Sequence, residues 1–314
     1  MGYFLFRRTL GFVLTLLAVS AVVFAVMNIL PGDPALTILG LDATEDALAA
    51  LREQLGLNEP LLTRYVHWVW NALHGDFGIS HSFRVPVSSL IAERLPMTIS
   101  LAVTGMVLTL AVALVLGIAA AARHRSFGDW GVMFVSQLGI AIPAFWLSIL
   151  LVLLFAVKLR WLPPGGFPGW SEPYEAMRSL ILPTVALALV QSAVLTRVTR
   201  SSALEIMRQD FVRTARASGF SQRRVLWRHV LPNALVPIVT IVGMQFAALV
   251  TGTIVIENVF YLPGLGRLIF QSIANRDLPT VQALVTLFAA IVVTANFIVD
   301  LLYLVIDPRL KARA

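Results

Sequence analysis

Three histidines recur every seven residues in the first third of the chain, at His67, His74 and His81. Histidine is the commonest metal ligand among side chains, and heptad spacing would bring the three rings to one face of a helix. Gly75 and Gly78 are expected to end such a helix before the third histidine. We therefore interpret the three residues as surface histidines without a metal, and a metal site is the alternative.

Other short motifs that carry catalysis in some proteins lack their context here. Asp76-Phe77-Gly78 matches a metal-binding triplet of protein kinases, but the chain has no glycine-rich loop and no H-R-D motif. No G-x4-G-K-[ST] sequence is present, and Gly264-Leu265-Gly266 lacks the third glycine of a nucleotide loop. The absence of cysteine excludes thiolate metal sites and cysteine nucleophiles. We assign no catalytic residue and expect no ATP hydrolysis by this chain.

A few polar side chains interrupt long apolar stretches. A charged group inside such a stretch is a functional candidate by default, and amides can hydrogen-bond between helices. Asp300 has the alternative of being solvated or paired with a loop arginine, and the amides could serve helix packing alone. The candidates for a pathway or an interhelical contact are Gln191, Gln245, Asn296 and Asp300.

The composition is that of a membrane protein. Apolar residues make up 58% of the 314 residues and charged residues 13%, against about 45–50% and about 25% in soluble domains. A pI near 10.5 would also suit a nucleic-acid-binding protein, but the basic residues stand in short runs between apolar segments. A soluble enzyme, a disordered chain and a nucleic-acid partner are all disfavoured.

Six stretches approach or exceed the roughly 20 apolar residues that cross a bilayer. We therefore predict an all-α integral membrane protein with six transmembrane helices. A cleaved signal peptide is the alternative for the first, but its apolar run is long and no clear cleavage site follows. Prolines are tolerated in such helices, because neighbouring helices satisfy the freed backbone groups. The predicted spans are Thr9–Leu30, Thr98–Ala122, Gly131–Val157, Leu180–Thr196, Ala234–Ile256 and Thr280–Ile306.

The distribution of Lys and Arg among the connections predicts how the chain is oriented in the membrane. The two termini and the second and fourth connections together hold 15 Lys and Arg and 4 acids, whereas the other side holds 9 and 12. Positive residues concentrate on the cytoplasmic side. Both termini and the connection 197–232 are therefore expected in the cytoplasm.

The first outer connection, residues 31–96, is too long for a simple link. Thr44 is expected to cap a helix that Gly56 stops, and a second amphipathic stretch rich in aromatic residues begins after Pro60. Two interpretations stay open: the helices pack on the outer ends of the bundle, or they form a docking or gating element for something delivered from outside.

The cytoplasmic connection carries eight arginines and only two acids. We predict a helix over Ser201–Ser218, a left-handed turn at Gly219, and a second short helix capped by Ser221 and ending at Val230. Two helices around a glycine would form a rigid lever on which another protein could push. The arginines could instead face lipid phosphates or pack within this subunit.

This connection resembles a signature of the permease subunits of bacterial ABC importers, E-A-A-x3-G-x9-I-x-L-P. Ala215, Gly219, Leu231 and Pro232 match it, while Arg213 replaces the glutamate and His229 the isoleucine. The version found in the peptide/nickel class, D-[FY]-V-R-T-A-R-A-x-G, matches the contiguous run Asp210–Gly219. Further matches, in order along the chain, are Pro31-Gly32-Asp33-Pro34, Gly75-Asp76-Phe77-Gly78, Glu257-Asn258-Val259-Phe260, Pro263-Gly264-Leu265-Gly266 and Asp307-Pro308-Arg309.

The resemblance implies a type I ABC importer permease in the bacterial inner membrane. It implies a first helix and outer loop over 1–95, a permease core over 96–307 with coupling helices near 201–230, and a tail over 308–314. Expected partners are a second homologous permease, two ATPases that bind ATP and Mg²⁺, and an extracytoplasmic binding protein. Peptide is the first expectation for the substrate and nickel the alternative; a channel or intramembrane enzyme is a distant one. The residues expected to couple to the ATPase are Asp210, Phe211, Arg213, Thr214, Ala215, Arg216, Gly219, Leu231 and Pro232.

Overall fold

The structure is a computed structural model that describes residues 2–29, 34–40, 43–54 and 56–306. Helices dominate it, and the described residues contain no strand beyond a single bridge between Ile79 and Pro86. The prediction of an all-α protein is confirmed. The helices are α1 (Gly2–Ile29), α2 (Pro34–Leu39), α3 (Glu45–Gln54), α4 (Leu61–Leu73), α5 (Val87–Ala122), α6 (Phe127–Ala141), α7 (Ala144–Leu151), η1 (Val152–Lys158), α8 (Pro173–Met207), α9 (Asp210–Ala217), α10 (Gln222–Val225), η2 (Leu226–Val230), α11 (Leu231–Val259), α12 (Leu265–Ala274) and α13 (Leu278–Ile306).

Among the described residues, five helices are long and apolar enough to cross a membrane, and the pair α6 and α7–η1 makes a sixth if it counts as one span. In the described residues the predicted spans fall on these helices; Leu30, the last residue of the first span, lies outside the described residues. The fourth prediction was too short, because Leu180–Thr196 lies inside the 35-residue helix α8 and Pro183 does not interrupt it. Helix α5 has 36 residues and is about 54 Å long at 1.5 Å per residue, well beyond the bilayer core of about 30 Å.

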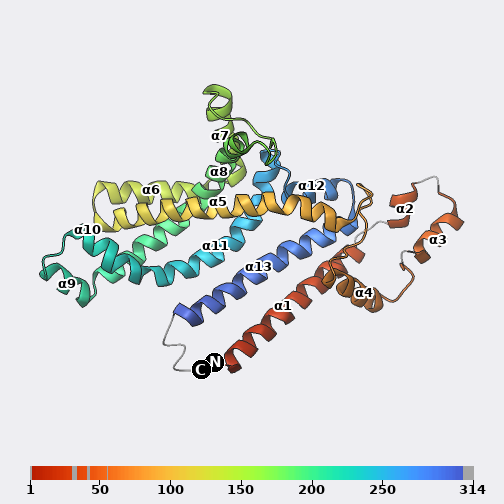
Figure 1. Cartoon of the computed structure of the whole chain (residues 1–314), viewed down its shortest axis with the longest axis horizontal. Coiled ribbons are helices and arrows are strands. Elements are labelled where there is room, and N and C mark those ends of the chain that lie inside the picture. The colour runs from red at the N-terminus through yellow and green to blue at the C-terminus, as the bar shows by residue number, and fades with distance from the viewer. Residues whose placement is uncertain (1, 30–33, 41–42, 55, 307–314) are drawn as a thin grey trace.

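The prediction of one continuous third helix over Gly131–Val157 was wrong. The chain bends by 106° between α6 and α7, and α7 projects from the bundle (Figure 1). Pro143 explains the break, because proline has no N–H to donate and forces the preceding residue out of the α conformation. Ile142 accordingly has the extended angles φ −85° and ψ 123°.

Helices α5 and α8 pack closely along their length because glycines of α5 face α8. A Cβ atom on Gly117 would lie 2.6 Å from Cβ of Thr199, and one on Gly105 would lie 2.9 Å from a methyl group of Leu187. Small residues allow membrane helices to approach in this way. A Cβ on Gly252 of α11 would lie 3.1 Å from the same leucine, so Leu187 lies where three helices converge.

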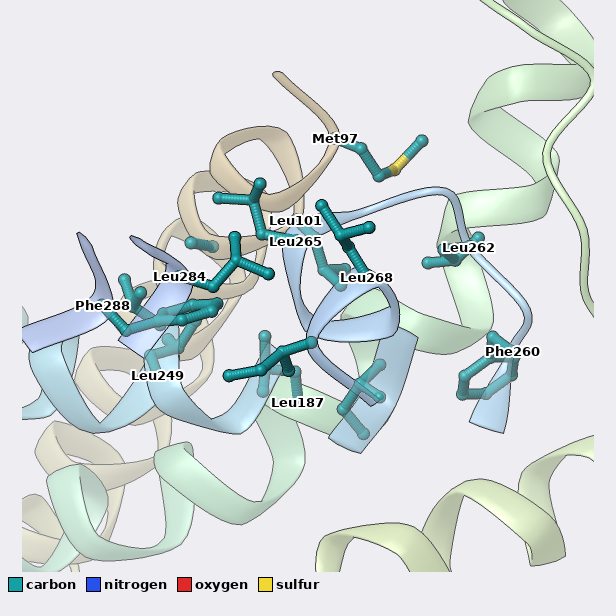
Figure 2. Packing of buried hydrophobic residues seen from close by; sticks show 14 of the residues in the cluster. Met97, Leu101, Leu187, Leu249, Phe260, Leu262, Leu265, Leu268, Leu284 and Phe288 are labelled. Atoms are coloured by element: carbon teal, nitrogen blue, oxygen red, sulfur yellow. The ribbon is translucent and has the colours of Figure 1, made fainter. Parts of the chain in front are cut away.

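The largest apolar core lies between α5, α8, α11, α12 and α13 (Figure 2). Helix α12, which the sequence analysis did not predict, lies across this core and buries Leu265 and Leu268 completely. Phe260 and Leu262, in the connection from α11, are also fully buried. The connection between α11 and α13 is therefore part of the core rather than a surface loop.

A buried carboxylate holds that connection in place. Glu257 is fully buried, and its Oε2 accepts a 2.7 Å hydrogen bond from the N–H of Gly266 at the start of α12. A Cβ on Gly264 would overlap the Glu257 carboxylate, and one on Gly266 would overlap Cα of Ile254. The run from Glu257 to Gly266 that resembles the importer family is thus explained by packing: only glycine leaves room for the carboxylate.

The outer connection contains both predicted helices. The N–H of Ala47 donates to Oγ1 of Thr44 at 3.4 Å, and α3 begins at Glu45 as expected; Leu55 and Pro31-Gly32-Asp33 lie outside the described residues. Helix α4 is joined to α1 by a 2.8 Å hydrogen bond between the hydroxyls of Tyr65 and Ser20. Packing on the bundle is therefore observed for α4, and the docking role stays a prediction.

A short hairpin, residues 75–86, follows α4, and a second buried carboxylate fixes it to the start of α13. Asp277 accepts hydrogen bonds from the hydroxyl of Ser80, from the N–H of His81 at 3.1 Å and from the hydroxyl of Thr280 at 2.8 Å. Gly75 and Gly78 have left-handed backbones with φ near +80°, and α4 ends before them, as predicted.

The three histidines at heptad spacing do not gather. His67 lies 3.6 Å from Glu59, His74 bonds to the carbonyl of Trp70, and His81 is held beside Asp277. The prediction that all three lie on the surface was wrong for His81, which is half-buried.

Different helices lie at the two ends of the molecule. The first residues of α1, the last of α13 and the short helices α9 and α10 lie toward one end, and α2, α3 and α4 lie at the other (Figure 1). This arrangement agrees with the charge count, since the arginine-rich connection and the ends of the first and last helices share a side.

The first prediction concerns Gly266, which packs against the backbone of α11. We expect Gly266→Ala to lower the free energy of unfolding by about 1–3 kcal/mol, because the new methyl group meets backbone that cannot move aside. Gly131→Ala is the matched control, since a Cβ there meets nothing within 4 Å. Thermal unfolding of the purified protein in detergent would measure both. Equal melting temperatures for the two variants would contradict the packing argument.

The second prediction concerns pH at the hairpin. Burial lowers the pKa of His81 from its usual value, against an opposing effect of the Asp277 charge. A histidine with a lowered folded pKa favours folding above the unfolded value near 6.5, and this contribution is lost as pH falls from there toward the folded value. We expect hydrogen exchange of residues 75–86, corrected for intrinsic rates, to accelerate between pH 7.5 and 5.5, and to do so less in His81→Gln. The same acceleration in both proteins would rule His81 out as the cause.

Candidate coupling surface

The arginine-rich connection begins with a break that the sequence analysis missed. The predicted single helix over Ser201–Ser218 is wrong: α8 ends at Met207, and α9 begins at Asp210 after an extended Gln209 with ψ 149°. The break reorients α9 so that Val212 and Ala215 are buried against the ends of other helices. Burial of this apolar face, rather than local helix propensity, decides where α8 stops.

The turn at Gly219 is confirmed. Gly219 has φ +81°, and it follows α9 in a Schellman motif. Its N–H donates to the carbonyl of Arg216 at 3.0 Å, and the N–H of Phe220 donates to the carbonyl of Ala215 at 3.4 Å. These bonds satisfy carbonyls at the helix end, and glycine takes the left-handed position because it has no Cβ.

The second short helix differs from its prediction at both ends. The Ser221 side chain makes no capping hydrogen bond, and α10 continues through η2 directly into α11 rather than ending at Val230. Pro232 lies in the first turn of α11, directly after the π-helical turn η2, and the helical run continues through it. Leu231 and Pro232 therefore join the connection to a membrane-spanning helix.

One apolar cluster fastens these short helices to the bundle. Its buried members come from the end of α5, from α8, from α9 and from the second short helix. A hydrogen bond from the Gln222 side chain to the carbonyl of Ala122, at 3.4 Å, adds a polar contact. The cluster consists of Ile118, Ala121, Ala203, Val212, Ala215, Val225, Leu226 and Val230.

The opposite face of α9 is exposed and basic. Phe211 is 43% exposed, and Arg213, Thr214 and Arg216 are exposed beside it. Arg213 pairs with Asp210 at 3.5 Å, but both side chains remain largely in solvent, so the pair contributes little. An exposed aromatic ring among arginines is a composition typical of protein interfaces.

Phe220, directly after Gly219, joins α9 to the second helix. Its ring stacks on His229 with centroids 5.6 Å apart, and the Arg224 guanidinium lies 4.9 Å from its centre. Beside it, Trp227 is 46% exposed. A notch of about 440 Å³ opens there, lined by Ser221, Arg223, Arg224, Trp227 and Arg228. The basic surface thus continues from α9 onto the second helix.

An ion pair at the same end of the bundle was not foreseen. Asp129, near the start of α6, is almost fully buried and accepts from two guanidinium nitrogens of Arg200 on α8, one at 2.7 Å. His124 lies 3.3 Å from the same carboxylate. No spacing in the sequence could reveal this pair, because 71 residues separate its members. It fixes the α5–α6 connection to α8 just before α9.

The four polar residues that were predicted to serve a pathway or an interhelical contact lie in two places. The Gln245 side chain donates to the carbonyl of Gln191 at 3.1 Å, so these two residues join α11 to α8. Asp300 pairs with Arg8 of α1 at 2.9 Å, and Asn296 lines a cleft beside that pair. The contact of Gln245 matches the packing alternative. Asp300 is paired with an arginine, but this arginine belongs to helix α1 and not to a loop. Any pathway role stays a prediction.

The described part of the chain offers no obvious metal site. Within it, no three His, Cys, Asp or Glu side chains group closely enough to hold an ion. The site that stands out is instead the exposed face of α9 and the second short helix, which we call the coupling surface. It presents arginines and aromatic rings, and its inner face is anchored to the bundle.

The Asp129–Arg200 pair gives the third prediction. The two side chains are 4% and 21% exposed, which places the pair between exposed pairs and fully buried ones. We expect Asp129→Asn to lower the free energy of unfolding on the order of 2 kcal/mol, because the charge of Arg200 loses its partner. Asp210→Asn, which breaks the exposed pair with Arg213, should leave stability unchanged. Both are measured by thermal unfolding, and indistinguishable variants would contradict this ranking.

Comparison with known proteins gives matches along nearly the whole chain. Residues 113–312 match the family described as the inner membrane component of binding-protein-dependent transport systems, and residues 1–102 match the N-terminal region of such components. A Brucella abortus (strain 2308) protein, named for a peptide transport system, is 44% identical over 306 residues, covering 97% of this chain and 98% of the relative.

Two further relatives are named for related substrates. The oligopeptide transport system permease protein AppB of Bacillus subtilis (strain 168) is 38% identical over 315 residues, which cover 99% of this chain and all of AppB. The glutathione transport system permease protein GsiC of Salmonella choleraesuis (strain SC-B67) is 41% identical over 308 residues, 98% of each chain. The chain therefore belongs to the inner-membrane components of binding-protein-dependent transport systems, the ABC importer permeases that work with ATPase and binding-protein subunits.

Proposed function

We propose that this chain forms half of a translocation path for peptides, opposite a second homologous permease. An extracytoplasmic binding protein delivers the peptide, and two cytoplasmic ATPases, which bind ATP and Mg²⁺, contact the coupling surface. Relatives named for peptide, oligopeptide and glutathione transport support the substrate class. Nickel remains the alternative within the same kind of importer.

The observation that carries the proposed coupling role is the two-faced character of α9. Val212 and Ala215 are buried in the cluster that fastens the connection to α5 and α8, while Phe211, Arg213 and Arg216 are exposed on the other side. A partner bound to the exposed face would therefore act on the bundle through the buried one. Acidic side chains on the ATPase would suit the arginines, since charge-assisted hydrogen bonds are stronger than neutral ones.

The proposed coupling residues have different tasks. Phe211, Arg213 and Arg216 would contact the ATPase, and Ala215 would pack inward. Thr214 donates its hydroxyl to the carbonyl of Asp210 at 3.1 Å, within the helix. Gly219 sets the angle between α9 and the second helix, and Leu231 and Pro232 lead the movement into α11. Transport then follows from rigid-body rocking of helices, the general expectation for transporters.

Gly219 allows a test of the lever, and it is the fourth prediction. Gly219→Pro would fix φ near −65°, whereas the turn needs about +81°. We expect about tenfold less peptide uptake per ATP hydrolysed in proteoliposomes that hold the whole importer. Gly219→Asn is the matched control, because asparagine tolerates the left-handed conformation better than other residues, and it should keep most of the coupling.

Two additional measurements make that test decisive. Membrane insertion and complex assembly of the proline variant must equal those of the wild type, so that a folding defect is not read as uncoupling. A photo-crosslinker at Arg216 should capture an ATPase subunit. Normal coupling in the proline variant would refute the lever, and failure of the crosslinker in assembled complexes would refute the contact. Uptake assays with labelled peptide and with Ni²⁺ would decide the substrate class.

A further inference from the structure

A cavity of about 440 Å³ lies at the outer end of the molecule, away from the coupling surface. It opens between the end of α1, the α3–α4 connection, one face of α4, the hairpin and the start of α13. The volume falls within the range of roughly 300–1,000 Å³ that is typical of small-molecule sites. The α4 residues that line it include Arg64, Trp68 and Asn71, which share one face because they are spaced by three and four residues.

Hydrogen bonds hold the walls of this cavity in place. The Tyr65–Ser20 contact joins α4 to α1, and Asp277 joins the hairpin to α13 through Ser80 and His81. Phe24 of α1 adds ring contacts to Tyr65 and Trp68, with centroids 5.4 Å and 6.3 Å apart. The cavity is therefore preorganised rather than a gap between loose loops.

The lining contains one arginine and two carboxylates that do not pair with one another. Arg64 is half-buried, and its guanidinium forms no ion pair or hydrogen bond with any residue that the structure describes. Among the described residues, Glu59 forms an ion pair with the largely exposed His67 alone, at 3.6 Å. One oxygen of Asp76 accepts the N–H of Gly78 at 2.9 Å, which leaves its second oxygen available. The cavity thus offers a free cation together with anionic oxygens.

Two buried polar atoms at the cavity lack partners as well. His81 Nδ1 and Gln282 Nε2 are enclosed by protein and make no hydrogen bond, and both residues line the cavity. Leaving a buried donor or acceptor unpaired is destabilising, because the group loses its hydrogen bonds to water and gains none in return. A rotation of either side chain toward the cavity would let a ligand with its own donors and acceptors remove that cost, whereas an apolar ligand would not.

We propose that this cavity binds a small zwitterion, an amino acid or a dipeptide. Its carboxylate would bind the Arg64 guanidinium, its ammonium group would lie toward Glu59 and Asp76, and its remaining polar atoms would meet His81 and Gln282. Arginine suits a carboxylate because its planar fork donates two parallel hydrogen bonds. The assignment rests on the cavity alone and holds whether or not the importer carries peptides.

The test is a binding measurement on the intact importer in lipid nanodiscs, without the binding protein. Isothermal titration with L-alanyl-L-alanine and with L-alanine should give saturable binding of at least one of them. N-acetyl-L-alanyl-L-alanine amide, which carries neither charge, should bind at least tenfold more weakly. The absence of saturable binding of both zwitterions, or equal binding of the blocked dipeptide, would overturn the proposal.

Variants locate the site. Arg64→Gln should weaken binding at least tenfold. Arg84→Gln is the control, because Arg84 is exposed on the nearby hairpin and does not line the cavity. Gln282→Leu replaces an unpaired buried amide, so it should keep the fold and weaken binding severalfold. If Arg64→Gln unfolds, this second variant still tests whether the ligand occupies the cavity. Quenching of Trp68 fluorescence by the ligand should vanish in Trp68→Phe. Full affinity in both Arg64→Gln and Gln282→Leu would place the ligand elsewhere and refute the assignment.

Discussion

The close contact between α5 and α8 is the constraint on which the rest of the structure depends. In a bilayer, apolar surface gains little from helix association, so packing contacts must supply the energy. The backbones approach closely only because Gly105 and Gly117 have no side chains to separate them. At its inner end α5 provides Ile118 and Ala121 to the cluster that anchors the coupling surface. Near its outer end, Thr98 accepts a 2.9 Å hydrogen bond from the N–H at the start of α12. One rigid pair of helices therefore joins both ends of the molecule.

The two ends are fastened by different kinds of interaction. At the outer end, Glu257 and Asp277 are fully buried and accept backbone and hydroxyl donors from α12, the hairpin and α13. Such bonds are directional, and breaking them would strand a buried polar group. At the inner end the coupling surface is held mainly by apolar contacts, which are non-directional, together with the Asp129–Arg200 pair. Small shifts of α9 are thus less costly than shifts of the outer connections.

The sequence was sufficient for features that depend on local pattern. Hydropathy located the spans, and the glycine after α9 predicted the left-handed turn that ends it. Features that depend on distant residues were missed. The break after Met207 arises because Val212 and Ala215 pack on α5, and the Asp129–Arg200 pair joins residues far apart in the chain. The motif around Gly264 and Gly266 was visible as a resemblance, but its cause, the space taken by the Glu257 carboxylate, needs the three-dimensional arrangement.

The connectivity of the short helices determines where a force on α9 would go. Helix α9 has a joint at each end, the extended Gln209 before it and Gly219 after it. The second short helix has no joint with α11, because α10, η2 and α11 follow one another without a break. A displacement of α9 therefore reaches α11 through the buried cluster and the Phe220–His229 stack, and it reaches the ends of α5 and α8 through the same cluster. The π-helical turn η2 lies on this route, and π-turns occur often at functional sites. Under the proposed role, α11 is the helix that receives the movement, and its contacts with α5, α8, α12 and α13 pass that movement to the bundle.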